Sequence, residues 1–333
     1  MSPAPGGGLP REVDERLHPE SRELLAELGA APLPGDPAFD LARSRREVTA
    51  GAPPPTAAGA RCRTRDLAVA GVPCRVYLPG GEGAPAGTVV HAHGGGFVEG
   101  DLESHDAVCR EVAVASGWAV VAVDYRLAPE HPFPAALEDL EAVLAAVAAG
   151  GVGGADRVGV GVGAGVGVPA APLALLGDSG GATLVAGACL RARRRERAGR
   201  PVPRVALQVL VYPGSGPAPA SPELERGLGL SPEARDWYQA AHVPDPSQRG
   251  LEEVVPLAAA SFADLPPAVV LTAELDPLRA GGEEHAARMA AAGVPVTSAR
   301  LGGVVHGFWR RPATQPTARA AVDLVAGALR RAG

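Results

Sequence analysis

The chain has 333 residues, 46% of them hydrophobic, so it can bury a large core, and one α/β domain is expected. Its net charge of −6 excludes the strongly basic proteins that bind nucleic acid. The N-terminus lacks the basic and apolar parts of a signal peptide, and the uncharged stretch 158–177 is too rich in glycine to predict a membrane span. We therefore expect a cytoplasmic protein without nucleic-acid or membrane partners.

Helix-like and strand-like segments alternate along most of the chain. Two helix-like segments come first, at residues 11–28 and 37–48, and three consecutive prolines at 53–55 end them. The predicted strands are residues 72–78, 88–92, 118–123, 173–176, 205–211, 268–273 and 296–301. The predicted helices are residues 104–116, 135–149, 182–197, 280–292 and 317–331. This alternation predicts an α/β fold with a mostly parallel, doubly wound sheet of about eight strands, flanked by helices.

Two regions interrupt the alternation. Residues 159–168 are almost all glycine and valine and are interpreted as an insertion. Residues 213–265 are rich in proline and glycine and contain two short helical pieces without a clear strand. Ligands of open α/β sheets bind at the carboxyl edge of the strands, and a helical cap is expected there. We assign residues 1–55 and 213–265 to the cap, and residues 56–212 and 266–333 to the core.

A nucleophile elbow is the first chemical motif. Residues 177–181 read Gly-Asp-Ser-Gly-Gly, which fits the pattern G-x-S-x-G around Ser179. The motif follows a predicted strand and precedes a predicted helix, which is the context that the elbow requires. Because the chain contains 44 glycines, this pattern alone is weak, and an ordinary glycine-rich turn is the alternative.

An oxyanion-hole motif is the second signal, and it is the stronger one. His93 and Gly94 open the run His-Gly-Gly-Gly-Phe directly after the predicted strand 88–92. In this motif, backbone N–H groups bind the negative charge that develops on a carbonyl oxygen during acyl transfer. The glycines let the backbone approach that oxygen closely.

A nucleophilic serine needs a histidine base and an acid that orients it, in the chain order Ser, acid, His. Three histidines follow Ser179: His242, His285 and His306. The first falls in the predicted cap, and the second falls in a predicted helix, where a solvated or capping position is expected. His306 follows the last predicted strand and is the best candidate base. Asp276 directly follows the strand 268–273 and is the candidate acid, with Glu274 as the alternative.

Together these motifs make the chain resemble the bacterial hormone-sensitive-lipase-like (family IV) esterases of the α/β-hydrolase superfamily. The matching stretches are collinear: residues 93–106, residues 123–139 with the run Asp-Tyr-Arg-Leu-Ala-Pro-Glu, residues 177–181, Tyr212-Pro213, Asp276-Pro-Leu-Arg279 and His306-Gly-Phe308. The resemblance implies that Ser179 is the nucleophile, His306 the base and Asp276 the acid. It implies an oxyanion hole made by the N–H groups of Gly95, Gly96 and Gly180. Gly180 stands where the family usually has alanine.

The expected activity is hydrolysis of carboxylic esters with short- to medium-chain acyl groups. Phe97, Trp237 and Tyr238 are the candidate pocket residues, and packing inside the cap is the alternative for the latter two. Hydrolysis of an amide, such as removal of an acetyl group from a secondary metabolite, uses the same triad and stays open. A non-catalytic receptor and a dehydratase or cyclase on the same fold are further alternatives. The expected partner is a small ester or amide, with a homodimer also open. No cofactor and no metal are expected, and the four cysteines are expected to be free thiols.

Overall fold

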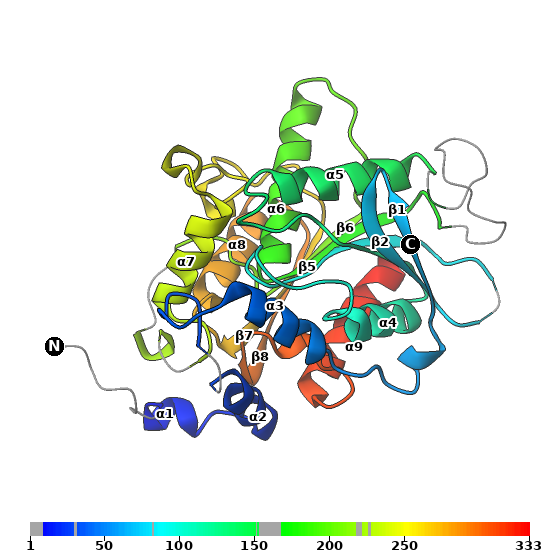
Figure 1. Ribbon diagram of the computed structural model, residues 1–333. Helices are drawn as coiled ribbons and strands as arrows, with labels where there is room; N and C mark the ends of the chain where they lie inside the picture. Colours follow the sequence, from blue (N-terminus) through cyan, green and yellow to red (C-terminus); the bar gives the residue numbers. More distant parts are fainter. Residues whose placement is uncertain are drawn as a thin grey trace.

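The computed structural model describes residues 9–29, 32–81, 83–150, 152, 168–217, 222–225 and 228–333. Within these residues, eight strands form one sheet in the order β1-β2-β4-β3-β5-β6-β7-β8, with helices on both faces (Figure 1). The strands are β1 (Arg63–Val69), β2 (Val72–Leu78), β3 (Thr88–Ala92), β4 (Ala119–Val123), β5 (Leu173–Asp178), β6 (Leu207–Val211), β7 (Ala268–Leu275) and β8 (Val296–Val305). The pairs β1–β2 and β2–β4 are antiparallel and the other pairs are parallel, so the predicted fold class is confirmed.

Some of the helices cover the sheet in two layers. The α-helices of the described residues are α1 (Arg11–Asp14), α2 (Pro19–Leu28), α3 (Leu41–Ala50), α4 (Asp106–Ser116), α5 (Ala135–Ala148), α6 (Gly180–Arg197), α7 (Pro232–His242), α8 (Arg279–Ala291) and α9 (Pro316–Ala332). Apolar side chains of α5, α6 and α8 pack on one face of the sheet. Those of α4 and α9 pack on the other face. The strands β3, β4, β5 and β6 are buried along their whole length, which explains their unbroken apolar sequences.

The N-terminal segment differs from the prediction in its helix boundaries. The single helix predicted over residues 11–28 is two helices, because Pro19 disfavours a helical conformation at His18 and restarts the chain as the first residue of α2. The helix predicted from residue 37 begins only at Leu41. There the side chain of Asp40 accepts a hydrogen bond from the N–H of Arg43 and caps α3.

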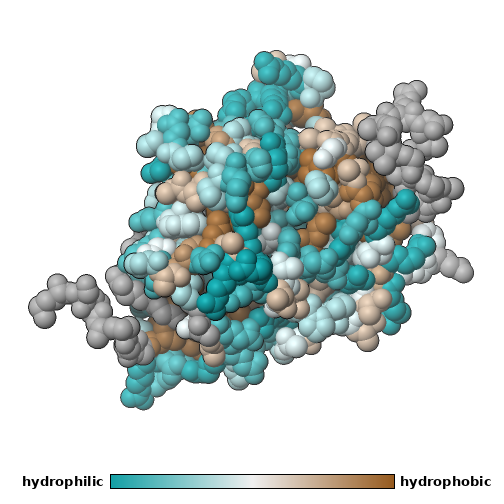
Figure 2. All heavy atoms as spheres, viewed as in Figure 1, coloured by the Kyte–Doolittle hydropathy of each residue, from teal (hydrophilic) through white to brown (hydrophobic). Residues whose placement is uncertain are grey.

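The segment 213–265 contains α7 and, among its described residues, no strand. The segment before α3 meets α7, which is far from it in the sequence (Figure 1), because Phe39 packs edge-on against Trp237 in α7. Hydrophilic side chains cover much of this side of the molecule (Figure 2). The proposed insertion at 159–168 lies outside the described residues except for Val168, and the proposed domain boundaries stay a prediction.

Two further expectations concern membranes and cysteines. Among the described residues, none of the helices is long and apolar enough to span a bilayer. All four cysteines are buried and free, as expected from their scattered positions.

Candidate active site

Ser179 occupies a sharp turn between β5 and α6. Its φ of 52° and ψ of −120° are unusual for a residue with a side chain, and strain of this kind is common at functional sites. The N–H of Ser179 donates a hydrogen bond of 2.9 Å to the carbonyl oxygen of Val211 in the neighbouring strand. A side chain at Gly181 would overlap the backbone of Ala92, so only glycine lets α6 approach β3 this closely. The turn places the Ser179 hydroxyl at the carboxyl edge of the sheet.

Ser179, His306 and Asp276 form a continuous chain of hydrogen bonds. Ser179 Oγ lies 2.8 Å from His306 Nε2, although the two residues are 127 positions apart. His306 Nδ1 lies 2.8 Å from Asp276 Oδ2, and the N–H of Leu278 donates to Asp276 Oδ1 over 2.8 Å. Asp276 is fully buried, whereas 15% of the His306 side chain is exposed. This geometry suits a histidine that accepts the serine proton while the carboxylate orients the ring.

Glu274, the alternative acid, has other partners. One carboxylate oxygen accepts from the guanidinium of Arg16, at 2.6 Å from Nη2, and the other accepts from the N–H of Gly303 at 2.7 Å. The bond from Gly303, together with the charge of Arg16, outweighs partial burial and lowers the pKa of Glu274. The geometry therefore favours Asp276 over Glu274 as the residue that orients His306.

The other two histidines after Ser179 are buried in other contacts. His285 is 1% exposed and its Nδ1 lies 2.8 Å from the hydroxyl of Ser215, so the expectation of a solvated or capping position was wrong. His242, at the end of α7, stacks on Phe97 with ring centroids 3.8 Å apart. Burial lowers the pKa of each of these histidines to about 4, so both are neutral near pH 7.

The glycine run after β3 faces the elbow. Gly95 and Gly96 have positive φ angles of 119° and 58°, and a side chain at Gly95 would overlap the backbone of Glu99. Their N–H groups donate to no acceptor among the described residues. A Cβ atom at Gly180 would lie 3.4 Å from the nitrogen of Gly96, so the loop and the start of α6 are in close contact. Unpaired N–H groups beside a serine hydroxyl are what an oxyanion hole requires.

His93 supports this loop from inside the protein. Its Nδ1 lies 2.8 Å from the carbonyl oxygen of Gly94, and its ring stacks on Tyr125 with centroids 4.1 Å apart. The hydroxyl of Tyr125 donates to the carbonyl oxygen of His93 over 2.7 Å. Burial lowers the pKa of His93 to about 3, so the ring is neutral near pH 7. Its contacts with Gly94 and Tyr125 hold the loop in place.

The three candidate pocket residues divide into two groups. The ring of Phe97 lies 3.4 Å from the place that a Cβ of Gly180 would take. The ring of Tyr238 packs against Gly96, and its hydroxyl donates to Glu99 over 3.1 Å. The structure thus brings Phe97 and Tyr238 beside the oxyanion loop, whereas Trp237 packs on the segment before α3.

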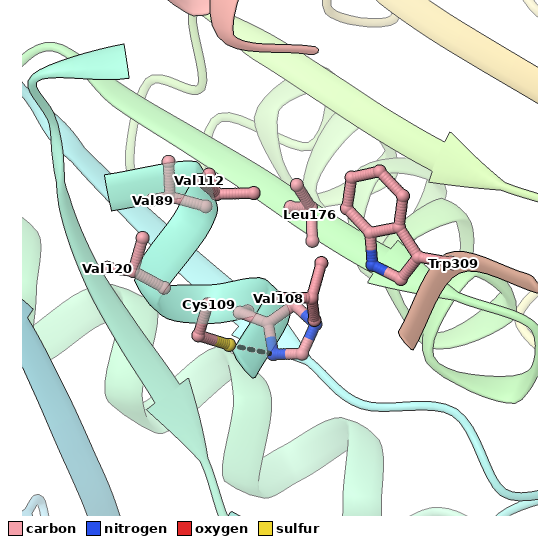
Figure 3. Close-up of a pocket in the computed structure, with 8 residues that line it drawn as sticks. Val89, Val108, Cys109, Val112, Val120, Leu176 and Trp309 are labelled. Atoms are coloured by element: carbon pink, nitrogen blue, oxygen red, sulfur yellow. Dashed lines mark hydrogen bonds between the residues drawn. The ribbon is translucent and has the colours of Figure 1, made fainter. Parts of the chain in front are cut away.

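A small apolar pocket lies elsewhere in the core, and none of the three triad residues lines it. It lies between the sheet and α4, is too narrow for a water molecule, and is lined by Val89, His91, Val108, Cys109, Val112, Val120, Leu176 and Trp309 (Figure 3). Its polar contact joins Cys109 Sγ and His91 Nδ1 at 3.5 Å (Figure 3). Among the described residues, no three His, Cys, Asp or Glu side chains lie together as metal ligands.

Two polar residues that contact the oxyanion loop were not predicted from the sequence. Asp178 occupies the variable position of the elbow motif and accepts a hydrogen bond from Gly94. Glu99 joins Tyr238 of α7 to Ser44 of α3, whose hydroxyl donates to it over 2.6 Å. Both are charged residues inside glycine-rich motifs. A charged residue at such a position is the one feature of the sequence that could have indicated their role.

The chain is similar in sequence and structure to known hydrolases. The family described as alpha/beta hydrolase fold matches residues 89–310. Esterase LipI of Mycobacterium tuberculosis is 36% identical over 286 residues, covering 80% of this chain and 82% of the relative. Ethyl acetate hydrolase of Pseudomonas putida is 35% identical over 246 residues, covering 72% of each chain.

The solved structures agree with the sequence relatives. The hyperthermophilic esterase of the archaeon Pyrobaculum calidifontis superposes with a TM-score of 0.79 at 33% identity, covering 95% of this chain and 98% of that one. A thermostable esterase of Pseudomonas putida has a TM-score of 0.81 at 26% identity, covering 95% and 97%. The chain therefore belongs to the hormone-sensitive-lipase-like (family IV) esterases of the α/β-hydrolase superfamily.

Proposed function

We propose that the chain is a serine carboxylesterase that hydrolyses esters of short- to medium-chain acids through an acyl-enzyme on Ser179. The observation that carries this proposal is the hydrogen-bonded chain from Ser179 through His306 to Asp276, beside the unpaired N–H groups of the glycine loop. The relatives support it, since they are named esterases, and one is named an ethyl acetate hydrolase.

In the acylation step, Ser179 Oγ attacks the ester carbonyl carbon while His306 Nε2 accepts the hydroxyl proton. Asp276 holds the other ring nitrogen of His306 and stabilises the imidazolium. The negative charge on the carbonyl oxygen is bound by the N–H groups of Gly95, Gly96 and Gly180. His306 then donates its proton to the leaving alcohol, the ester C–O bond breaks, and the acyl group stays on the serine.

In the deacylation step, a water molecule replaces the alcohol. His306 accepts a proton from this water as its oxygen attacks the acyl carbon, and the same N–H groups bind the second oxyanion. The bond to Ser179 Oγ then breaks, His306 returns the proton to the serine, and the carboxylic acid leaves. Both steps use the same donors and the same base, so no cofactor is needed.

We infer the preference for short chains from the cap, which we assign to residues 1–55 and 213–265. Tyr238 packs against Gly96 of the oxyanion loop, and Phe97 lies over the start of α6, so aromatic rings close the space around Ser179. Aromatic residues make up only 4% of the chain, which limits any longer apolar channel. Acyl groups of roughly eight carbons or fewer are expected to fit best, since each CH₂ left in water forgoes about 0.8 kcal/mol of burial.

A panel of p-nitrophenyl esters from acetyl to palmitoyl tests the activity and the chain length together. The expected result is a kcat/KM that peaks at about eight carbons or fewer and is absent in Ser179→Ala. A rise that continues to palmitoyl would contradict the short-chain preference. A fluorophosphonate probe that fails to label the wild-type protein would contradict the nucleophile. Matched p-nitroanilides measure the amide alternative directly.

A further inference from the structure

A buried carboxylate lies behind the oxyanion loop. Asp178 is the last residue of β5, directly before Ser179, and is 2% exposed. Its Oδ1 accepts a hydrogen bond of 3.0 Å from the N–H of Gly94, and its Oδ2 accepts one of 3.1 Å from the hydroxyl of Tyr212. A side chain at Gly94 would overlap Asp178 Oδ2, so the loop backbone packs directly on the carboxylate.

His105, from the loop before α4, completes this arrangement. Its Nε2 lies 3.3 Å from Asp178 Oδ1. Its Nδ1 lies 3.0 Å from the hydroxyl of Ser104. Both ring nitrogens therefore have polar neighbours, which fix the orientation of the ring.

These neighbours keep Asp178 ionised. Burial alone would raise the pKa of the carboxyl, but His105 and then His91, whose Nε2 lies 3.8 Å from Oδ1, outweigh it and hold the pKa of Asp178 well below its usual range. An ionised carboxylate accepts hydrogen bonds on both oxygens, and bonds to an ionised acceptor are stronger than neutral ones. Both Gly94 and Tyr212 are therefore held firmly.

The contacts of Asp178 reach three parts of the candidate site. It is covalently adjacent to Ser179. Through Gly94 it holds the start of the glycine loop. Through Tyr212 it holds a ring that packs on His306 with centroids 4.6 Å apart. One buried side chain thus joins the nucleophile, the oxyanion loop and the base.

We propose that Asp178 is a positioning residue that fixes the oxyanion loop against the nucleophile elbow and thereby determines kcat. The proposal rests on the esterase function proposed above. Donors that bind a transition state act only when they are held in place before the reaction, and small displacements cost large factors in rate. A residue with a merely structural role would change the fraction of folded protein but not the turnover of each folded active site.

The test measures kcat per Ser179 labelled by a fluorophosphonate, so that unfolded protein is not counted. In Asp178→Ala we expect kcat on p-nitrophenyl butyrate to fall roughly 100-fold, with KM within about threefold, because the lost contact acts on the transition state. In Asp178→Asn we expect a fall of only about three- to tenfold, since the amide oxygen can still accept from Gly94. Ser116→Ala is the matched control, because it removes a buried hydrogen bond within α4. Its kcat per labelled serine should be unchanged.

An unchanged kcat per labelled serine in Asp178→Ala would overturn the proposal, as would a loss confined to KM. If the alanine variant does not fold, the asparagine variant decides by the same two criteria. If neither folds, Tyr212→Phe decides, since it keeps the ring on His306 and removes one bond to Asp178. A kcat reduced about threefold at constant KM then supports the proposal, and an unchanged kcat overturns it. Failure of the wild-type protein to be labelled or to hydrolyse esters would instead contradict the proposed function.

Discussion

The two sides of the candidate active site are held in place in different ways. On the first side, Ser179 and the glycine loop are fixed from inside the sheet by the buried carboxylate of Asp178. On the second side, Asp276 and His306 follow β7 and β8, the last two strands of the sheet, and are supported from outside. The support there comes from the N-terminal segment, at the opposite end of the chain.

Gly303, three residues before His306, is the centre of the external support. Its carbonyl oxygen accepts hydrogen bonds from the N–H of His18, at 2.9 Å, and from the hydroxyl of Ser21, at 2.8 Å. Its N–H donates to Glu274, which also binds Arg16. We call these contacts the Gly303 clamp.

An apolar cluster reinforces the Gly303 clamp. Leu275 and Val305, the residues directly before Asp276 and His306, are both fully buried in it. The remaining buried members are Val13, Leu17, Leu24, Leu224 and Leu228. The first side is thus built from neighbouring core strands, whereas the second depends on contacts between the two ends of the chain. The second side therefore depends more on contacts with the N-terminal segment, and the first depends more on a buried carboxylate.

The largest expected effect is on the first side, at the nucleophile itself. Ser179→Ala should lower kcat by about six decades, because loss of a triad nucleophile leaves only binding and the oxyanion hole. The fold should persist, since alanine is no larger than serine at this turn. Initial rates on p-nitrophenyl butyrate and thermal unfolding measure the two properties. Substantial hydrolysis by the purified, folded variant would contradict the assignment of Ser179.

The next-largest effect is expected at the second side, where the losses of kcat at two carboxylates can be compared. Asp276→Asn should lower kcat roughly 10⁴-fold, because a neutral amide neither holds His306 in the required tautomer nor stabilises its imidazolium. Glu274→Gln should lower kcat less than about tenfold, since Glu274 acts only through the Gly303 clamp. The kcat of both variants, measured by steady-state kinetics, shows which carboxylate orients His306. If Glu274→Gln proved the more damaging change, the acid would be Glu274.

A smaller effect is expected from breaking the Gly303 clamp. Gly303 has a φ of 66°, and a side chain there would overlap the ring of His18. Gly303→Ala should push the N-terminal segment away and lower kcat roughly 10- to 100-fold through the displacement of His306. Gly293→Ala is the matched control, because Gly293 has a φ of 84° but no neighbour within 4 Å of a new Cβ. It should lose only about 1 kcal/mol of stability, with kcat unchanged. Equal kinetic effects in both variants would show that backbone strain, not the clamp, is responsible.

Much of the first side could be predicted from the sequence because its parts are short and local. The apolar runs of β3 and β5, the elbow and the glycine loop each fall within a few residues, and β3 and β5 pair directly in the sheet. β1 was not predicted, since it is an edge strand with mostly exposed polar residues and shows no apolar run.

Most of what supports the second side could not be predicted from the sequence. Ser21 and Gly303 are 282 positions apart, and no periodicity in either segment indicates that they meet. The burial of His285 has the same origin, because its partner Ser215 lies 70 positions away in another element. β8 also extends to Val305 rather than ending near residue 301, which places His306 directly after it. Contacts of this kind depend on the assembled fold and leave no local pattern.

The smallest expected effect concerns the stability that Glu274 contributes through the clamp. Its folded pKa is lowered, first by the hydrogen bond from Gly303 and then by Arg16, relative to about 4.3 in the unfolded chain. A lowered carboxyl pKa stabilises the fold at pH values above the unfolded pKa, and this contribution is lost as the pH falls through the folded pKa.

Glu274→Gln should therefore cost about 1 kcal/mol of unfolding free energy at pH 7, and less as the pH is lowered towards 3. Urea unfolding of the wild-type protein and the variant at a series of pH values measures this difference. Glu284→Gln is the control, because Glu284 pairs with Arg288 at an exposed position within α8, and its effect should stay below about 0.5 kcal/mol. A difference for Glu274→Gln that grew as the pH fell would contradict the assigned role of this carboxylate.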